Sequence, residues 1–126
     1  MKVQTYLASK KSPLAEHTDI LISVPNWKRI VALANAESGM CRFYPKKLAN
    51  CWGVGGSKLW DMGNDLSDGI LEMNDFLINY PKKSKVKYHQ MTFKQMNGLY
   101  KQPAAPHWLY NVQVIYDDLT AIENSI

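Results

Sequence analysis

The sequence predicts a mainly α-helical protein, a single domain over residues 1–126. A chain of 126 residues that is 46% hydrophobic and 21% charged has the composition of a folded domain with one core. Most of its length repeats apolar residues with the period of a helix. Capping residues, prolines and glycines stand where those segments begin and end, so we expect about five helices.

The first predicted helix covers residues 12–23, with Ser12 as its N-cap and Pro13 in its first turn. The second covers residues 26–39, and apolar residues occupy most of its circumference. That pattern is typical of a central, buried helix. Gly39 is expected to end it in the left-handed conformation.

Three further helices are predicted over residues 67–80, from residue 92 and over residues 108–123. The first is capped by Asp65 or Ser67 and stopped by Pro81, and Thr92 with Gln95 has the spacing of a capping box. Between the helices, residues 51–67 contain four of the seven glycines and two of the four tryptophans. This composition predicts an irregular loop or a short hairpin.

The chain is basic, with a net charge of +4 and a pI near 9.0, which suits nucleic acid, anionic lipid or an anionic cell-wall polymer. Its densest basic run, PKKSKVK at residues 81–87, is typical of a solvated loop. No nucleic-acid-binding motif accompanies it, so we expect no nucleic-acid partner. No apolar run reaches the roughly 18 to 20 residues of a membrane helix, so we expect no membrane insertion. Residues 1–11 do not read as a secretory signal, which leaves an intracellular protein or a trimmed, exported one.

The two cysteines, Cys41 and Cys51, leave two alternatives open. A disulfide would close a short loop and stabilise an exported protein by roughly 2 to 4 kcal/mol. In a reducing compartment they would be buried thiols. His17, His89 and His107 are not at ligand spacing from either cysteine, so we expect no metal and no other cofactor.

Glu37 stands in the last turn of the predicted central helix, next to Ala34 and Ala36. Apolar surroundings and the negative end of the helix dipole both disfavour a charged carboxylate there. A carboxylic acid that keeps its proton is what general acid catalysis at a glycosidic oxygen requires. The alternative is a side chain that points into water from the helix end.

Four motifs follow one another along the chain: ANAESG at 34–39, NCWGVGG at 50–56, DGI at 68–70 and LYKQPAAPHWLYN at 99–111. In this order they resemble the lysozyme-like superfamily, and within it the bacterial glucosaminidase and lytic transglycosylase domains that cut peptidoglycan. There, an apolar helix ends in A-x-E-S-x-x-G, and a glycine-containing stretch lines the sugar cleft. The glycine of the first motif comes one or two positions early here.

The resemblance implies that Glu37 is the general acid and that Ser38 contacts substrate. It also implies a tyrosine hydroxyl near Glu37, for which we favour Tyr110 over Tyr100. A hydrolase normally needs a second carboxylate, and Asp61 is our candidate for it. A lytic transglycosylase is understood to work with a single glutamate.

Aromatic rings suit sugar sites because one face of a pyranose is apolar. By resemblance we expect Trp52, Gly53 and Gly55 of the NCWGVGG motif to form a wall of the cleft. Trp60 and Trp108 are further candidates, and core packing is the alternative for each tryptophan.

The resemblance therefore implies a lysozyme-like helical domain that cleaves β-1,4 bonds in peptidoglycan or a related GlcNAc-containing polysaccharide. The reaction is hydrolysis, as in an N-acetylglucosaminidase or muramidase, or alternatively a lytic transglycosylation that leaves anhydro-MurNAc ends. A non-catalytic glycan-binding module is the alternative from another class. We expect an extracellular, periplasmic or wall-associated monomer.

Overall fold

The computed structural model describes residues 2–125 and confirms a mainly helical fold. The α-helices are α1 (Lys2–Ser9), α2 (Thr18–Ser23), α3 (Trp27–Ser38), α4 (Leu66–Asn79), α5 (Phe93–Met96) and α6 (Pro106–Asn124). Short 3-10 helices are η1 (Pro13–His17), η2 (Lys46–Leu48) and η3 (Tyr88–Gln90). Over this range there is no strand, only an isolated bridge between Asn97 and Lys101. None of these helices has the length and apolar character needed to cross a bilayer.

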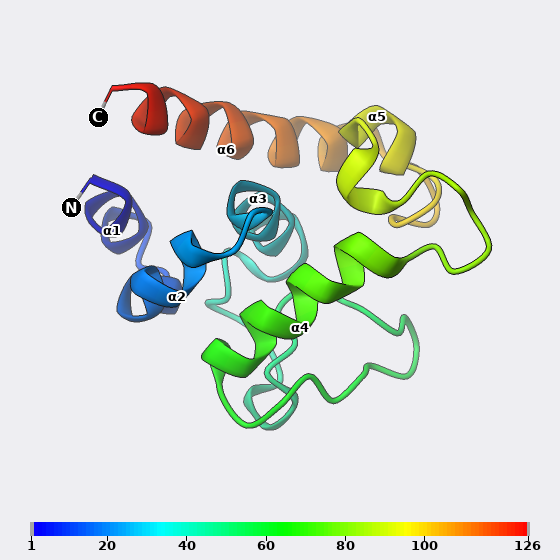
Figure 1. The fold of residues 1–126 in the computed structure, drawn as a ribbon, viewed down its shortest axis with the longest axis horizontal. Coiled ribbons are helices and arrows are strands. Elements are labelled where there is room, and N and C mark those ends of the chain that lie inside the picture. Colours follow the sequence, from blue (N-terminus) through cyan, green and yellow to red (C-terminus); the bar gives the residue numbers. More distant parts are fainter. Residues whose placement is uncertain (1, 126) are drawn as a thin grey trace.

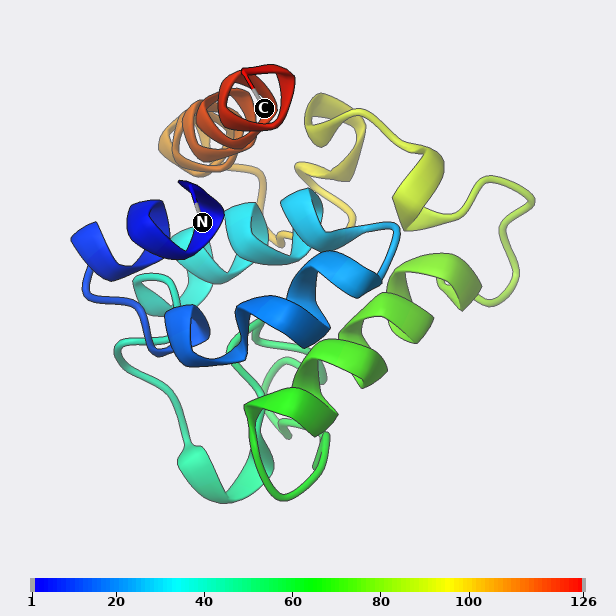
Figure 2. The same ribbon diagram turned by 60° about the vertical axis from the view of Figure 1, so that its left-hand side comes forward.

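Helix α3 is the centre of the fold, as its sequence predicts. It contacts α6, α4 and α2, and Figure 1 shows it between α6 on one side and α4 on the other. Ile30, Val31 and Leu33 have no exposed surface. In Figure 2, α1 lies beside the C-terminal part of α6, where the Tyr6 hydroxyl donates to Asp118 at 2.9 Å.

The N-terminal region differs from the prediction in two ways. The helix predicted over residues 12–23 is two pieces, η1 and then α2. Ser12 is the predicted N-cap and accepts from the Leu14 N–H, but the Thr18 hydroxyl donates to the Ala15 carbonyl between the two pieces. Helix α1 was not predicted, because only Val3 and Leu7 of its residues are buried and two positions make no readable stripe.

Three predicted helix caps are confirmed, whereas the last helix begins at Pro106, two residues before its predicted start. Gly39 follows α3 with φ of 60°, in the left-handed region. Of the two candidate caps of α4, Asp65 is the one used, and its carboxylate accepts from the Asp68 N–H at 3.1 Å. Thr92 and Gln95 make both hydrogen bonds of the capping box that opens α5.

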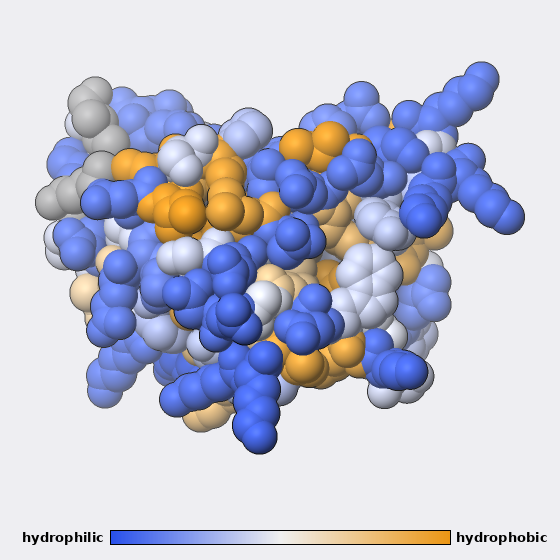
Figure 3. Space-filling view, turned by 60° about the horizontal axis from the view of Figure 1, so that its bottom comes forward, coloured by the Kyte–Doolittle hydropathy of each residue, from blue (hydrophilic) through white to orange (hydrophobic). Residues whose placement is uncertain are grey.

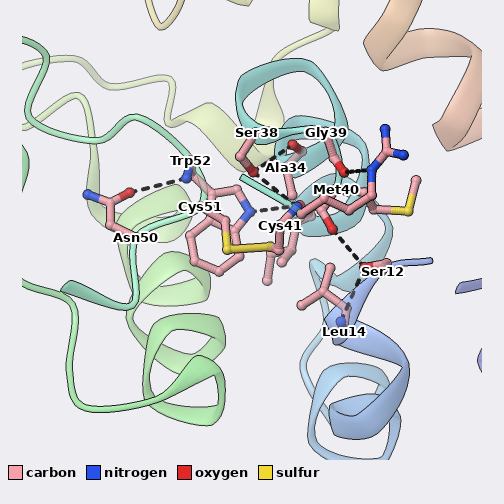
Figure 4. Close-up of a disulfide and its surroundings, with 12 residues drawn as sticks. Ser12, Leu14, Ala34, Ser38, Gly39, Met40, Cys41, Asn50, Cys51 and Trp52 are labelled. Atoms are coloured by element: carbon pink, nitrogen blue, oxygen red, sulfur yellow. Dashed lines mark hydrogen bonds between the residues drawn. A yellow bond between two sulfur atoms is a disulfide. The ribbon is translucent and has the colours of Figure 1, made fainter. Parts of the chain in front are cut away.

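A disulfide joins Cys41, just after α3, to Cys51 at the start of the glycine-rich segment. Figure 4 shows this link beside the turn that ends α3, with the Ser12 hydroxyl donating to the Met40 carbonyl on the other side. Of the alternatives for the two cysteines, the bonded one is confirmed. The glycine-rich segment is consequently held against the end of the helix that carries Glu37.

Candidate active site

A cleft of about 610 Å³ opens beside the end of α3. It is lined by Glu37, Trp52, Gly53, Val54, Gly55, Gly56, Leu59, Trp60, Phe76, Tyr88, Leu99, Tyr100, Lys101 and Gln102. Among these lining residues Glu37 is the one carboxylate, and Lys101 is the one cation. Four other segments, the glycine-rich segment, α4, η3 and residues 99–102, therefore meet around the single acidic group on α3.

Glu37 is held by a hydrogen bond from a buried tryptophan. The indole N–H of Trp108, whose residue is 3% exposed, donates to Glu37 Oε2 at 2.9 Å. An indole nitrogen can donate but not accept, so Oε2 is fixed as an acceptor. When the carboxyl is neutral, its proton is therefore best placed on Oε1.

From its position in the helix we expect apolar groups to enclose the carboxylate of Glu37, and the structure shows that they do not. The Glu37 side chain is exposed, because the residue lies at the last turn of α3, where the core ends and the cleft begins. It does not simply point into bulk water either, since Trp108 fixes one oxygen. The Glu37 carboxylate is thus both held in one orientation and accessible from the cleft.

Gly53 faces the free oxygen of this carboxylate. A Cβ at residue 53 would lie 3.0 Å from Glu37 Oε1, and its backbone has φ of 68°. Any other residue would be strained and would press on the acid. Glycine here leaves Oε1 open to the cleft.

Asn50 organises the segment that contains Gly53, and sequence reasoning did not identify it. Its buried side chain accepts from the Trp52 N–H at 3.1 Å and donates to the carbonyls of Val54 at 2.9 Å and Trp60 at 3.1 Å. These bonds take the place of a strand ladder. The only advance signal is the tendency of asparagine in a glycine-rich stretch to bond nearby backbone.

Tyr100, not Tyr110, is the tyrosine beside Glu37. The Tyr100 hydroxyl donates to the Trp52 carbonyl. Burial raises the pKa of Tyr100 well above its usual value, and the nearby charges of Glu37 and Tyr88 act in the same direction. Tyr110 is 69% exposed on the outer face of α6. It follows the inward-facing Trp108 by two residues, which is slightly more than half a helical turn, so its side chain points the opposite way.

Asp61 lies outside the cleft, so it does not form a pair with Glu37 in this structure. Its exposed side chain lines recesses next to Met62 and Glu72. Asp61 Oδ1 accepts from the Gly63 N–H at 3.1 Å, which holds the carboxylate in a local turn.

Trp52 and Ser38 are buried and stabilise the fold, so neither side chain is open to a substrate in the cleft. Trp52 borders the cleft but has 0% exposure, and its indole N–H donates to the Ile30 carbonyl at 2.8 Å. A sugar cannot stack on a ring that the core encloses. The buried Ser38 hydroxyl donates to the Ala34 carbonyl and accepts from the Cys41 N–H, which stabilises the end of α3.

The aromatic surface of the cleft is formed by other residues. Trp60 is 43% exposed, and its ring centroid is 5.6 Å from that of Phe76. The row continues from Phe76 to Tyr88 at 5.6 Å and from Tyr88 to Tyr100 at 5.5 Å. Phe76 and Tyr88 were not predicted, because one lies within a helix stripe and the other follows the lysine-rich run. We refer to Trp60, Phe76, Tyr88 and Tyr100 as the aromatic row.

The fold therefore brings some of the predicted site residues into the cleft and leaves the others buried or outside it. Glu37, Gly53, Gly55, Trp60 and Tyr100 line the same cleft, and Trp108 reaches it through Glu37. Within residues 2–125, no three His, Cys, Asp or Glu side chains are grouped so as to hold a metal ion. No protein-family model, curated protein or solved structure matches this chain.

Proposed function

We propose that this protein is a lysozyme-like glycosidase that cleaves β-1,4 bonds of the peptidoglycan glycan strand, with Glu37 as general acid. The observation that carries the proposal is a single carboxylate, oriented by the Trp108 indole, that opens into a cleft beside the aromatic row. The sugar rings would pack on the exposed face of Trp60, and a glycosidic oxygen would lie near Glu37 Oε1. The order of motifs along the sequence supports the same function.

The two oxygens of Glu37 would have different tasks. Oε1, next to Gly53, would donate its proton to the leaving sugar oxygen as the C–O bond breaks. The carboxylate that remains would be stabilised by the Trp108 N–H on Oε2, since hydrogen bonds to ionised acceptors are stronger than neutral ones. This arrangement favours the product state of the proton transfer without moving any side chain.

A lytic transglycosylase is the second candidate, and the composition of the cleft favours it. Hydrolases normally place two carboxylates around the scissile bond, whereas Glu37 is alone among the described residues that line this cleft. In a transglycosylation, the 6-hydroxyl of the substrate would attack its own anomeric carbon. Glu37, deprotonated by the first step, would take up the hydroxyl proton.

Digestion of purified peptidoglycan, with the new chain ends identified by mass, tests both candidates. Reducing GlcNAc or MurNAc ends indicate hydrolysis, anhydro-MurNAc ends indicate transglycosylation, and no product would indicate a binding module. Glu37→Gln should lower the rate by at least about 100-fold, the range of a lost general acid. It should still fold, since the glutamine oxygen can accept from Trp108.

Asp61→Asn is the matched control, because it also neutralises one carboxylate but outside the cleft. We expect its rate to stay near that of the wild type. A Glu37→Gln protein that digests peptidoglycan at the wild-type rate would end the proposal.

A further inference from the structure

A lysine-rich loop is joined to the aromatic row through the tyrosines at its two ends. Residues 81–87 connect α4 to η3, and they hold Lys82, Lys83, Lys85 and Lys87. Tyr88, which directly follows the loop, lines the cleft. Tyr80, which directly precedes it, stacks on Phe76 with ring centroids 4.7 Å apart. The loop is therefore attached to the aromatic row at both of its ends.

The loop is held by its own hydrogen bonds. The Tyr88 N–H donates to the Tyr80 carbonyl at 2.8 Å and closes the loop at its base. Inside, the Lys87 ammonium donates to the carbonyls of Pro81 at 2.8 Å and Lys82 at 3.2 Å. Lys87 thus has a structural position that the other three lysines lack.

The other three lysines, Lys82, Lys83 and Lys85, are exposed and unneutralised. Within residues 2–125, the single salt bridge joins Lys28 to Glu123, far from this loop in the sequence. The Lys82 ammonium lies 5.9 Å from the centroid of the Tyr80 ring, next to the aromatic row. In Figure 3, long hydrophilic side chains project from the right-hand edge, the side on which this loop lies in Figure 1.

Acidic residues line a recess that adjoins the same aromatic rings. Asp61, Glu72 and Asp75 line a separate recess of about 210 Å³, together with Trp60 and Tyr80. An anionic chain that enters the cleft is repelled by these carboxylates and attracted by the lysines. Charge therefore favours a path for such a chain over the lysines and disfavours one over the recess.

We propose that Lys82, Lys83 and Lys85 bind carboxylates of the glycan strand that occupies the cleft. This inference rests on the proposed function and specifies its substrate: a glycan with a carboxylate on alternate sugars, in preference to a neutral GlcNAc polymer. Exposed ion pairs are individually weak and are screened by salt. Three together should change affinity by about tenfold at low ionic strength and by much less at high ionic strength.

The test compares two ligands of similar length on the Glu37→Gln protein, which holds substrate without turnover. One ligand is peptidoglycan glycan strand freed of its peptides by an amidase, so that each MurNAc carries a lactyl carboxylate. The other is neutral chitohexaose. Dissociation constants are measured at about 20 and about 200 mM NaCl, a range over which screening of surface charges changes strongly.

The loop variant carries Lys82→Gln, Lys83→Gln and Lys85→Gln. The matched control carries the same change of charge at exposed lysines outside the loop, as Lys46→Gln, Lys47→Gln and Lys94→Gln. We expect the loop variant to bind the glycan strand about tenfold more weakly at low salt, with little remaining salt dependence, and to bind chitohexaose as before. The control should bind both ligands as the unmodified protein does, and Lys85→Gln alone should give a smaller loss in the same direction.

Other results would overturn the inference in distinguishable ways. Equal losses in the loop variant and the control would assign the effect to net charge. Loss of chitohexaose binding in the loop variant would mean that the loop shapes the cleft. Salt-independent binding of both ligands by the parent protein would refute the lysine inference alone, whereas binding of neither would refute the proposed function itself.

Discussion

Replacing Trp108 by phenylalanine removes a hydrogen bond that orients the proposed acid. Phenylalanine keeps a buried aromatic ring next to Tyr100, whose centroid is 6.3 Å from that of Trp108. It loses the N–H that donates to Glu37 Oε2 at 2.9 Å. Glu37 would then be free to rotate within the cleft, and the position of Oε1 relative to a bound sugar would no longer be fixed.

The expected loss follows from the strength and the exposure of this bond. A hydrogen bond to a charged group contributes roughly 1.5 to 3 kcal/mol when water cannot replace it. Because the Glu37 side chain is exposed, water will replace part of it, and about 1 to 2 kcal/mol remains. At about 1.4 kcal/mol for each tenfold change in rate, kcat should fall by about 5- to 30-fold.

The assay is steady-state digestion of peptidoglycan strands, with kcat and KM determined separately and a thermal melt of each variant. We expect KM to be nearly unchanged, because the 3% exposed Trp108 offers no surface to the sugar. Trp27→Phe is the matched control, since Trp27 is also buried but begins α3, at the opposite end from Glu37. Both variants should melt a few degrees lower, and only Trp108→Phe should be slow.

Two results would refute this reasoning. A Trp108→Phe protein with kcat within about twofold of the wild type would show that the indole does not position the acid. A raised KM with unchanged kcat would instead mean that Trp108 contacts the substrate, contrary to its burial.

Two further predictions concern stability. Trp52→Ala should cost roughly 3 to 5 kcal/mol of unfolding free energy, because it deletes a fully buried ring, yet leave sugar affinity of the folded protein unchanged. Trp60→Ala should weaken oligosaccharide binding with only a small loss in melting temperature. Fluorescence titration and thermal melts check both variants. Weaker sugar binding by Trp52→Ala, with a small loss in melting temperature, would restore Trp52 to the site. The pKa of Tyr100 is raised on folding, so its protonated hydroxyl stabilises the folded state. This contribution to the free energy of unfolding is complete below the unfolded tyrosine pKa near 10 and is lost as pH rises above it. Urea unfolding between pH 7 and 11 should therefore show a steeper alkaline fall for wild type than for Tyr100→Phe, and parallel curves would contradict this.

The helical class and several helix caps could be predicted from the sequence because they depend on residues only a few positions apart in the chain. Thr92 and Gln95 bond each other's backbone within one turn, and Asp65 caps the N–H three residues ahead. The apolar circumference of residues 26–39 likewise required a buried helix wherever the rest of the chain went. The split of residues 12–23 was missed because the Thr18 side-chain bond competes with a regular helix at little cost.

The candidate site was predicted only in part. Glu37 was singled out by its place at the end of an apolar helix and by its surrounding motif, and its catalytic role remains a prediction. For the aromatic residues, type and spacing could not separate a ring enclosed by the core from one open to a cleft. Trp52 and Trp60 both stand in the glycine-rich segment, yet one is 0% and the other 43% exposed.

Sequence alone therefore determined that the fold is mainly helical, the caps at Gly39, Asp65 and Thr92, and which carboxylate stands at the end of the central helix. Tertiary structure decided what faces that carboxylate: the Trp108 indole on one oxygen, Gly53 at the other, and Tyr100 instead of Tyr110 nearby. The physical reason is the range of the interactions. Caps and helix periodicity act over three or four residues, whereas the cleft joins groups up to 71 positions apart, whose meeting depends on the packing of the whole chain.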